Sequence, residues 1–308
     1  MATVLITEPI VPQAVALLKE KGFDTVKLFE KEAPDPGDVV AAIVRMGYVT
    51  GSWMDTYPNL RIIAYHGVGT DDIDLGAAKA RGIAVTTTPG QNSLSVAEHT
   101  LALMLALAKQ LPQVAAAYRD RGFKAKYDFA YSELSGRTLG LVGLGNIGCS
   151  VARMAYHGFG MRILAYDPHA VEPPEGVTCT TDRMAVFRES DFVSLHLPIT
   201  AETARTVSRT EFASMKPTAF LINCARGGIV DEAALVEALR GGIIAGAGLD
   251  VSDPEPAEAD SPLFTLPNII LTPHTAASAA EAMERVARMC VDNIAAYLSG
   301  STPEGRVI

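Results

Sequence analysis

The chain has 308 residues, of which 48% are apolar and 20% are charged. At roughly 100–200 residues per domain this length allows about two domains, and the apolar content excludes a disordered chain. Acidic residues (35) outnumber basic ones (26), which gives a formal net charge of -9. Such a chain lacks the positive field that binds nucleic acids and anionic membranes, so neither is expected as a partner. An anionic substrate would need a local cationic pocket.

The four cysteines are widely spaced, and no pair has the C-x-x-C spacing of a metal or redox motif. Reduced thiols are therefore expected. The N-terminus has no cationic region and Glu8 and Pro9 interrupt its apolar run, unlike a signal peptide. The most apolar stretch, 101–108, is shorter than the roughly 20 residues that span a bilayer. We expect a soluble cytoplasmic protein.

From the N-terminus, short apolar runs alternate with longer helical stretches. The runs predict strands at 3–6, 61–64 and 84–86, with helices at 11–21 and 73–80. This alternation is typical of a parallel, doubly wound sheet. A long helix rich in Ala and Leu is expected over 95–120, with Ser95 as its N-cap.

After this helix the same alternation starts again. A strand at 138–142 precedes a helix from about Asn146, and a further helix is expected at 232–239. Five short apolar runs predict the other strands, at 161–166, 192–195, 219–223, 245–249 and 269–271. The chain therefore holds two α/β units, and the final helix, 277–298, could return to the first of them.

A glycine motif, Gly143-Leu-Gly145-Asn-Ile-Gly148, directly follows the strand at 138–142. In this context the three glycines allow a tight turn, the approach of a pyrophosphate, and close packing of the helix on the strand. The pyrophosphate then binds the helix N-terminus. Asp167 follows the next strand, about 20 residues later, where a carboxylate binds the ribose of NAD and disfavours NADP. A plain glycine turn with Asp167 as a helix cap is the weaker alternative.

Three ionisable side chains also follow predicted strands, at the sheet edge where open α/β folds bind ligands. Taken singly, Arg226 could be a surface charge, Glu255 a solvated loop acid and His274 a helix cap. Together they supply what hydride transfer to a carbonyl requires. An Arg binds a carboxylate bidentately and a His exchanges a proton with the carbonyl oxygen. A Glu orients the imidazole and raises its pKa.

Further motifs extend over nearly the whole chain: GVGTDDID from residue 67, TPGQNSLSVAEH from 88, SLHLP from 194, NCARGGIVD from 223 and PH at 273. In these motifs the sequence resembles the NAD-dependent D-isomer-specific 2-hydroxyacid dehydrogenases, close to phosphoglycerate dehydrogenase. The resemblance implies two doubly wound parallel-sheet domains. A Rossmann cofactor domain would cover 99–276, and a flavodoxin-like, discontinuous substrate domain would cover 1–98 and 277–308. It also implies a homodimer formed through the cofactor domain and the segment 111–134.

The resemblance assigns roles to single residues and implies no metal. Arg226, Glu255 and His274 match the catalytic positions, and Arg226 and His274 also contact the substrate. Val68 and Gly69 match a loop whose backbone N–H groups bind the substrate carboxylate. The matches to cofactor contacts are Gly143, Gly145, Asn146, Ile147 and Gly148 at the pyrophosphate, Asp167 at the ribose, Leu197 and Pro198 at the adenosine, and Cys224 and Asp250 at the nicotinamide.

The substrate is less well defined. Many phosphoglycerate dehydrogenases carry a phosphate-binding Arg where this chain has Tyr65, and the chain ends at Ile308 without an appended regulatory domain. Both features disfavour phosphoglycerate without excluding it, and Tyr65 suits glyoxylate, hydroxypyruvate or a related small 2-keto acid. His196 has a catalytic side chain but matches a structural position near the cofactor. Cys224 has no neighbouring base, and the reaction needs no covalent intermediate.

Two other functions fit the same architecture. One is an NAD-sensing binding protein, such as a corepressor, with weak catalysis; sensing needs no proton donor, so the Arg–Glu–His set disfavours it. The other is formate dehydrogenase, which resembles this architecture but pairs its His with Gln, so Glu255 favours a keto or hydroxy acid instead.

Overall fold

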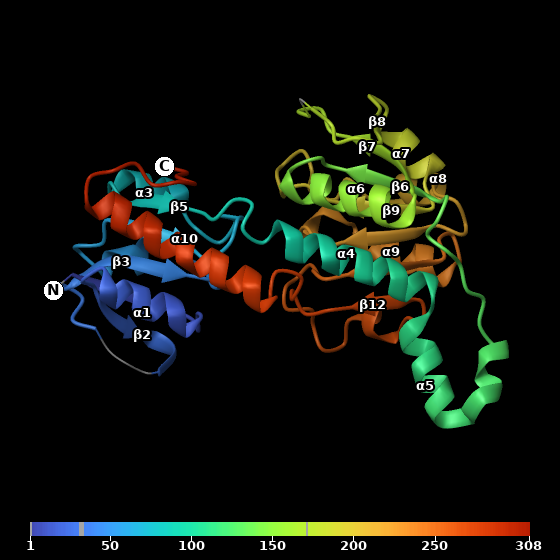
Figure 1. The fold of residues 1–308 in the computed structure, drawn as a ribbon, viewed down its shortest axis with the longest axis horizontal. Helices are drawn as coiled ribbons and strands as arrows, with labels where there is room; N and C mark the ends of the chain where they lie inside the picture. The colour runs from blue at the N-terminus through green and yellow to red at the C-terminus, as the bar shows by residue number, and fades with distance from the viewer. Residues whose placement is uncertain (1, 31–33, 171) are drawn as a thin grey trace. The chain divides into compact units, whose positions relative to one another are not determined.

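The computed structural model describes residues 2–30, 34–170 and 172–308. The chain divides into two compact units, which we call the split unit (Met1–Asn92 with Ala277–Ile308) and the central unit (Ser93–Ala276). The first division therefore falls at 92/93, whereas the sequence placed it at 98/99. The reason is that helix α4, Ser93–Ala108, is continuous and packs within the central unit. Figure 1 shows an α/β layer structure in each unit.

The split unit contains a five-stranded, fully parallel sheet in the order β2-β1-β3-β4-β5. Its strands are β1 Thr3–Ile6, β2 Asp24–Lys27, β3 Val39–Val44, β4 Ile62–Tyr65 and β5 Ala84–Thr86. This strand order is that of flavodoxin-like folds, as predicted. Apart from Thr3, β1 and β3 consist of apolar residues, as expected for strands of a sheet with helices on both faces.

The C-terminal helix completes this unit. Helices α1 (Pro12–Glu20) and α10 (Ala280–Leu298) cover one face of the sheet, where Val291 and Ile294 pack with Ile62 and its neighbours. The other face is covered by α2 and α3, Gly51–Asp55 and Leu75–Ala80. Full burial of one such aliphatic side chain contributes about 1.5–3 kcal/mol. The expected return of the last helix to the first unit is therefore confirmed, although it begins at Ala280 rather than 277.

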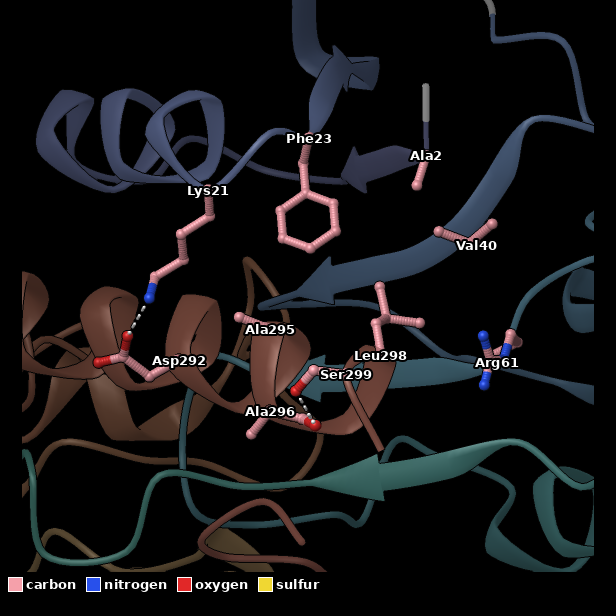
Figure 2. A pocket seen from close by; sticks show the side chains of 10 residues that line it. All are labelled: Ala2, Lys21, Phe23, Val40, Arg61, Asp292, Ala295, Ala296, Leu298 and Ser299. Carbon is pink, nitrogen blue, oxygen red and sulfur yellow. Dashed lines mark hydrogen bonds and ion pairs between the residues drawn. The ribbon is translucent and has the colours of Figure 1, made fainter. Parts of the chain in front are cut away.

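A cavity of about 780 Å³ lies at the amino-terminal edge of this sheet, between the ends of α1 and α10. Its walls are mostly apolar, and the ring of Phe23 points into it from the start of β2 (Figure 2). Lys21 and Asp292 form an ion pair of 3.2 Å that joins α1 to α10 along one side. Arg61 lines the other side and immediately precedes β4, so the cavity lies at the edge of the sheet opposite Val68.

The central unit contains a seven-stranded parallel sheet in the order β12-β11-β10-β9-β6-β7-β8. Its strands are β6 Thr138–Val142, β7 Arg162–Tyr166, β8 Val177–Cys179, β9 Phe192–Leu195, β10 Phe220–Asn223, β11 Gly246–Leu249 and β12 Ile269–Leu271. Counted within the unit, this is the Rossmann order 3-2-1-4-5-6 with a seventh strand added. The order reverses between β6 and β9, which is where folds of this kind bind ligands.

Six helices accompany this sheet among the described residues: α4, α5 Leu111–Arg121, α6 Asn146–Phe159, α7 Arg183–Glu189, α8 Arg209–Ser214 and α9 Glu232–Arg240. Phe187 of α7, Phe212 of α8 and Leu235 of α9 are fully or almost fully buried and belong to one apolar cluster with strand residues such as Leu221. This cluster fixes one face of the sheet, so the loops at the carboxyl ends of the strands have a rigid base.

The predicted long helix over 95–120 is wrong in two respects. It is two helices, because Gln110 adopts a left-handed backbone (φ 47°) and Pro112 opens α5. Ser95 is not an N-cap, because α4 begins at Ser93 and the Ser95 hydroxyl donates to the backbone oxygen of Ala276. Figure 1 shows α5 extending away from the central sheet.

Within the described residues, no single helix combines the length and apolar composition needed to cross a membrane. One bent pair, Ser93–Ala108 with Leu111–Tyr127, meets those two criteria jointly with a 49° bend.

Candidate active site

The glycine motif forms a tight turn between β6 and α6. Gly143 has φ 103°, and a Cβ there would lie 2.3 Å from the backbone oxygen of His196. At Gly148 a Cβ would lie 2.2 Å from the oxygen of Gly143, so α6 can approach β6 only without a side chain. Both positions therefore need glycine for reasons of geometry and close packing.

Gly145 differs from the other two glycines. It is the N-cap of α6, and no atom lies within 4 Å of a Cβ built on it. No side chain of the described residues caps the helix there, which leaves the first N–H groups of α6, from Asn146 and Ile147 onward, without an intrahelical partner. An open, uncapped helix N-terminus after a parallel strand suits a dinucleotide pyrophosphate, and the residues present fit that group.

Asp167 lies in the loop after β7, half-buried beside the glycine turn. Its Oδ2 accepts a hydrogen bond from Leu144 N at 2.7 Å, and its Oδ1 accepts one from His169 N at 2.8 Å. The carboxylate therefore ties the glycine turn to the loop after β7. Sequence reasoning predicted a ribose ligand at this position but not this second role.

The remaining predicted cofactor residues fall at the same edge of the central sheet. Leu197 and Pro198 follow β9, with the side chain of Leu197 next to Gly143. Cys224 follows β10 and is buried, which raises the pKa of its thiol to about 12, so it stays protonated and is no nucleophile. Its assignment to the nicotinamide remains a prediction, as do those of the other cofactor residues.

Asp250, expected at the nicotinamide, is fully buried at the end of β11. Its carboxylate accepts hydrogen bonds from Thr272 Oγ1, Thr275 N and Ala276 N, at 2.5, 2.9 and 2.8 Å. These three donors belong to residues 272–276, which we call the His274 loop. The structure thus gives Asp250 a structural task that the sequence did not suggest.

The three predicted catalytic residues follow three neighbouring strands. Arg226 follows β10, Glu255 follows β11 and His274 follows β12, and these strands pair in register as β10-β11-β12. Because parallel strands present their carboxyl ends at one edge, side chains far apart in sequence are brought to one place. Among the described residues, no group of three or more His, Cys, Asp or Glu side chains is arranged so that it could hold a metal ion.

His274 and Glu255 are in direct contact. The imidazole Nδ1 is hydrogen-bonded to Glu255 Oε1, and the two side chains are 50% and 40% exposed. No hydrogen bond of the imidazole Nε2 occurs among the residues described, so this atom can meet a substrate. His274 also has a left-handed backbone (φ 51°), held by a hydrogen bond of 2.8 Å from its N–H to Asp250 O.

The electrostatics of this pair favour a proton on His274. The hydrogen bond that His274 donates to the Glu255 carboxylate raises the pKa of His274, and burial and the Arg226 charge only partly oppose it. For Glu255, burial acts to raise the pKa, but the hydrogen bond and charge of His274, with Arg226, hold it below its usual value. Both shifts favour the imidazolium–carboxylate form of the pair, which is the form that general acid catalysis uses.

Arg226 is held close to this couple. Its Nη1 donates to Ala225 O at 2.8 Å, and the Asn223 side chain donates to its backbone oxygen at 2.9 Å. A Cβ on Gly227 would lie 2.0 Å from Ser252 O, so the backbone of this segment passes directly against the loop after β11. The guanidinium charge acts on both Glu255 and His274, which places it in the same site.

The predicted substrate loop lies in the split unit. Val68 and Gly69 follow β4, and Val68 is exposed. A Cβ on Gly67 would lie 2.8 Å from the ring of Tyr65, and the Gly67 oxygen accepts two hydrogen bonds from Thr88. The ring and these bonds fix the start of the loop and leave the backbone of Val68 at the carboxyl edge of the sheet.

His196 has the environment of a structural residue. Its Nε2 is 3.0 Å from Ser194 Oγ, and burial lowers its pKa to about 4. The side chain is therefore neutral at physiological pH and cannot serve as the acid, in agreement with the position it matches.

Comparison with known proteins identifies the family that this chain resembles. Residues 101–276 match the model of the D-isomer specific 2-hydroxyacid dehydrogenase, NAD binding domain. The D-3-phosphoglycerate dehydrogenase of Methanocaldococcus jannaschii is 39% identical over 318 residues, covering 100% of this chain and 59% of that protein. The glyoxylate reductase of Korarchaeum cryptofilum is 42% identical over 257 residues, covering 81% of this chain and 76% of that protein.

A solved structure shows the same architecture. The NADPH-dependent glyoxylate/hydroxypyruvate reductase of Sinorhizobium meliloti, crystallised with NADP and malonate, superimposes with a TM-score of 0.87 at 34% identity. The match covers 99% of this chain and 96% of that one. By contrast, the chain spans only 59% and 57% of the first two phosphoglycerate dehydrogenases that it matches. The chain belongs to the D-isomer-specific 2-hydroxyacid dehydrogenase family.

Proposed function

We propose that this protein transfers a hydride between NAD(H) and a D-2-hydroxy acid or its 2-keto acid. The observation that carries the proposal is the His274–Glu255 couple beside Arg226, at the same sheet edge as the glycine turn and Asp167. A binding protein that only senses NAD has no use for a proton donor with a raised pKa. Family membership and the relatives' activities support the same reaction class.

In the proposed reaction each residue has one task. Bound NADH supplies the hydride. Arg226 holds the substrate carboxylate with its planar guanidinium. For Val68 and Gly69, the proposal that their backbone N–H groups bind substrate rests on the resemblance alone. His274 gives the proton on Nε2 to the keto oxygen as the carbonyl is reduced, while Glu255 stabilises the imidazolium before transfer. In the oxidative direction the neutral imidazole takes the proton back.

The substrate class is a short 2-keto acid. Relatives act on 3-phosphoglycerate or on glyoxylate, by their names, and the Tyr65 ring over Gly67 supplies no charge for a phosphate. We therefore favour glyoxylate or hydroxypyruvate over 3-phosphohydroxypyruvate. A panel of these three acids, assayed by loss of NADH absorbance, tests both points. Turnover of at least one is expected; NADH binding without turnover of any 2-keto acid would favour the NAD-sensing alternative.

The assignment of Asp167 gives a cofactor prediction. Asp167→Ala removes the ribose acceptor and the negative charge, so we expect the Kd for NADH to rise about 10-fold or more, given roughly 1.5–3 kcal/mol for a charged hydrogen bond. The preference for NADH over NADPH should shrink, because no carboxylate opposes the 2′-phosphate. Fluorescence titration with both cofactors measures this. Asp260→Ala, at an exposed loop acid, is the control, and a wild-type preference for NADPH would refute the assignment.

We also propose a homodimer formed through α5 and the segment that follows it. Phe123 and Tyr127 are 70% and 77% exposed, and Lys126 lies over both rings. Neighbouring exposed aromatic side chains are typical of a protein interface. The double variant Phe123→Glu/Tyr127→Glu should be monomeric by light scattering after size exclusion. Phe264→Glu, at a ring that is 57% exposed elsewhere in the central unit, should leave the dimer intact. A wild-type monomer contradicts the proposal.

All four cysteines are free. This suits the reducing cytoplasm that we propose as the site of action, and a buried thiol such as Cys290 is protected from oxidants in any case.

A further inference from the structure

The position of His274 depends on one buried carboxylate. Asp250 has no exposed surface, and it accepts hydrogen bonds from Thr272 Oγ1 and from Ala276 N, near the two ends of the His274 loop. Its backbone oxygen also accepts from His274 N. A shift of this carboxylate would therefore move the imidazole.

Two side chains of α4 contact the same loop. His99 Nε2 is 3.0 Å from Thr272 Oγ1 and 3.5 Å from Asp250 Oδ1. One helical turn earlier, Ser95 Oγ donates to Ala276 O at 2.6 Å. Residues four apart share one helix face, so a single face of α4 holds both ends of the loop. Neither His99 nor Ser95 is among the residues matched to substrate or cofactor.

The direction of these hydrogen bonds follows from the number of protons available. The Thr272 hydroxyl has one hydrogen, and its 2.5 Å contact with the Asp250 carboxylate uses it, because an ionised carboxylate only accepts. Toward His99 the Thr272 oxygen must therefore accept, so His99 Nε2 carries a proton. A directed chain runs from His99 through Thr272 to Asp250.

We propose that His99 is a positioning residue for the reaction: its Nε2–H, donated to Thr272, holds Asp250 and the His274 loop in the geometry that proton transfer requires. The inference rests on the proposed role of His274. Without the His99 N–H, the hydrogen-bond network around the buried Asp250 carboxylate is incomplete and therefore less stable. The His274 loop then shifts to restore the hydrogen bonds of this carboxylate. Small displacements of an acid from its substrate lower the rate sharply.

The network also bears on the proton affinity of His274. The charged groups that face His274 are Glu255 and Asp250, which raise its pKa, and Arg226, which lowers it. Cys224, near Asp250, is a neutral thiol because burial raises its pKa to about 12. If the loop relaxes, the hydrogen bond with Glu255 and the interaction with Asp250 both weaken. The pKa of His274 then falls.

A matched pair of substitutions separates the loss of the His99 N–H donor from the loss of side-chain packing. His99→Met removes the N–H and keeps an unbranched apolar side chain that suits a helix, whereas His99→Gln restores an N–H at a similar distance from the backbone. Each variant is tested as the full chain for kcat and KM with an active 2-keto acid. The His274 imidazole is titrated by NMR after labelling the histidines with ¹³C, a readout that does not depend on turnover. The surface substitution His157→Ala on α6 is the control.

For His99→Met we expect kcat to fall about 10-fold or more with little change in KM, and the His274 titration to move to lower pH. His99→Gln should restore both toward wild type. Wild-type kcat and an unmoved titration in His99→Met would overturn the inference, as would a folded Gln variant as impaired as the Met variant. Failure of the proposed function is recognised separately, by undiminished turnover in His274→Ala.

Discussion

Replacing His274 with Ala is expected to lower kcat for 2-keto acid reduction by about 100-fold or more, because general acid–base catalysis contributes roughly 10²–10⁴-fold. The imidazole is half exposed, and Nδ1 is engaged by Glu255, which leaves Nε2 as the proton donor. Affinity for NADH should change little, since the glycine turn and Asp167 are in other loops. Steady-state kinetics and fluorescence titration of the cofactor separate the two effects.

The same measurement on His157→Ala provides the control, because His157 is exposed on α6 and takes no part in the proposed chemistry. Loss of cofactor binding together with turnover would point to misfolding rather than to a missing acid, and circular dichroism would detect it. Unchanged turnover in a folded His274→Ala enzyme would remove the residue from the mechanism.

Arg226→Lys should have the second large effect, although the charge is retained. A guanidinium presents a planar pair of N–H donors to a carboxylate, and an ammonium cannot. One charged hydrogen bond contributes roughly 1.5–3 kcal/mol, so we expect kcat/KM for the keto acid to fall about 10- to 100-fold. The Lys side chain also loses the contact that Arg226 Nη1 makes with Ala225 O at 2.8 Å, which positions the guanidinium.

Steady-state kinetics over a wide range of keto acid concentrations measure this loss. Arg240→Lys, at the exposed end of α9, is the matched control and should behave as wild type. Wild-type kcat/KM in the Arg226 variant would show that a point charge suffices there and that no bidentate contact forms.

Much of the fold was predictable because its strands are short, apolar and buried. The run of β6 precedes the glycine motif and matches its predicted bounds, Thr138–Val142, without error. β3, Val39–Val44, has an equally clear apolar signal but was not predicted. β8, Val177–Cys179, is partly exposed and carries no such signal, so only its pairing with β7 defines it. The break at Gln110 combines a left-handed backbone, which helix propensity does not report, with Pro112, a sequence signal that the prediction of one long helix left out.

The candidate site was predictable in its residues and less so in its contacts. Arg226, Glu255 and His274 stand out because each follows a strand, and strand order brings such residues to one edge. No sequence motif indicates the network of His99 with Asp250, because its members are far apart in the chain and meet only through the packing of α4 on the sheet. The sequence motif predicts only a cofactor ligand at Asp250.

The most direct test of the account is the pH dependence of kcat for keto acid reduction in wild type and in Glu255→Gln. Reduction needs protonated His274, so the rate is full at low pH and falls as pH rises through the pKa of His274. Glu255 raises that pKa; without its charge the pKa drops, and the falling limb should move to lower pH. A falling limb at the same pH in both enzymes would contradict the proposal that the His274–Glu255 couple supplies the proton.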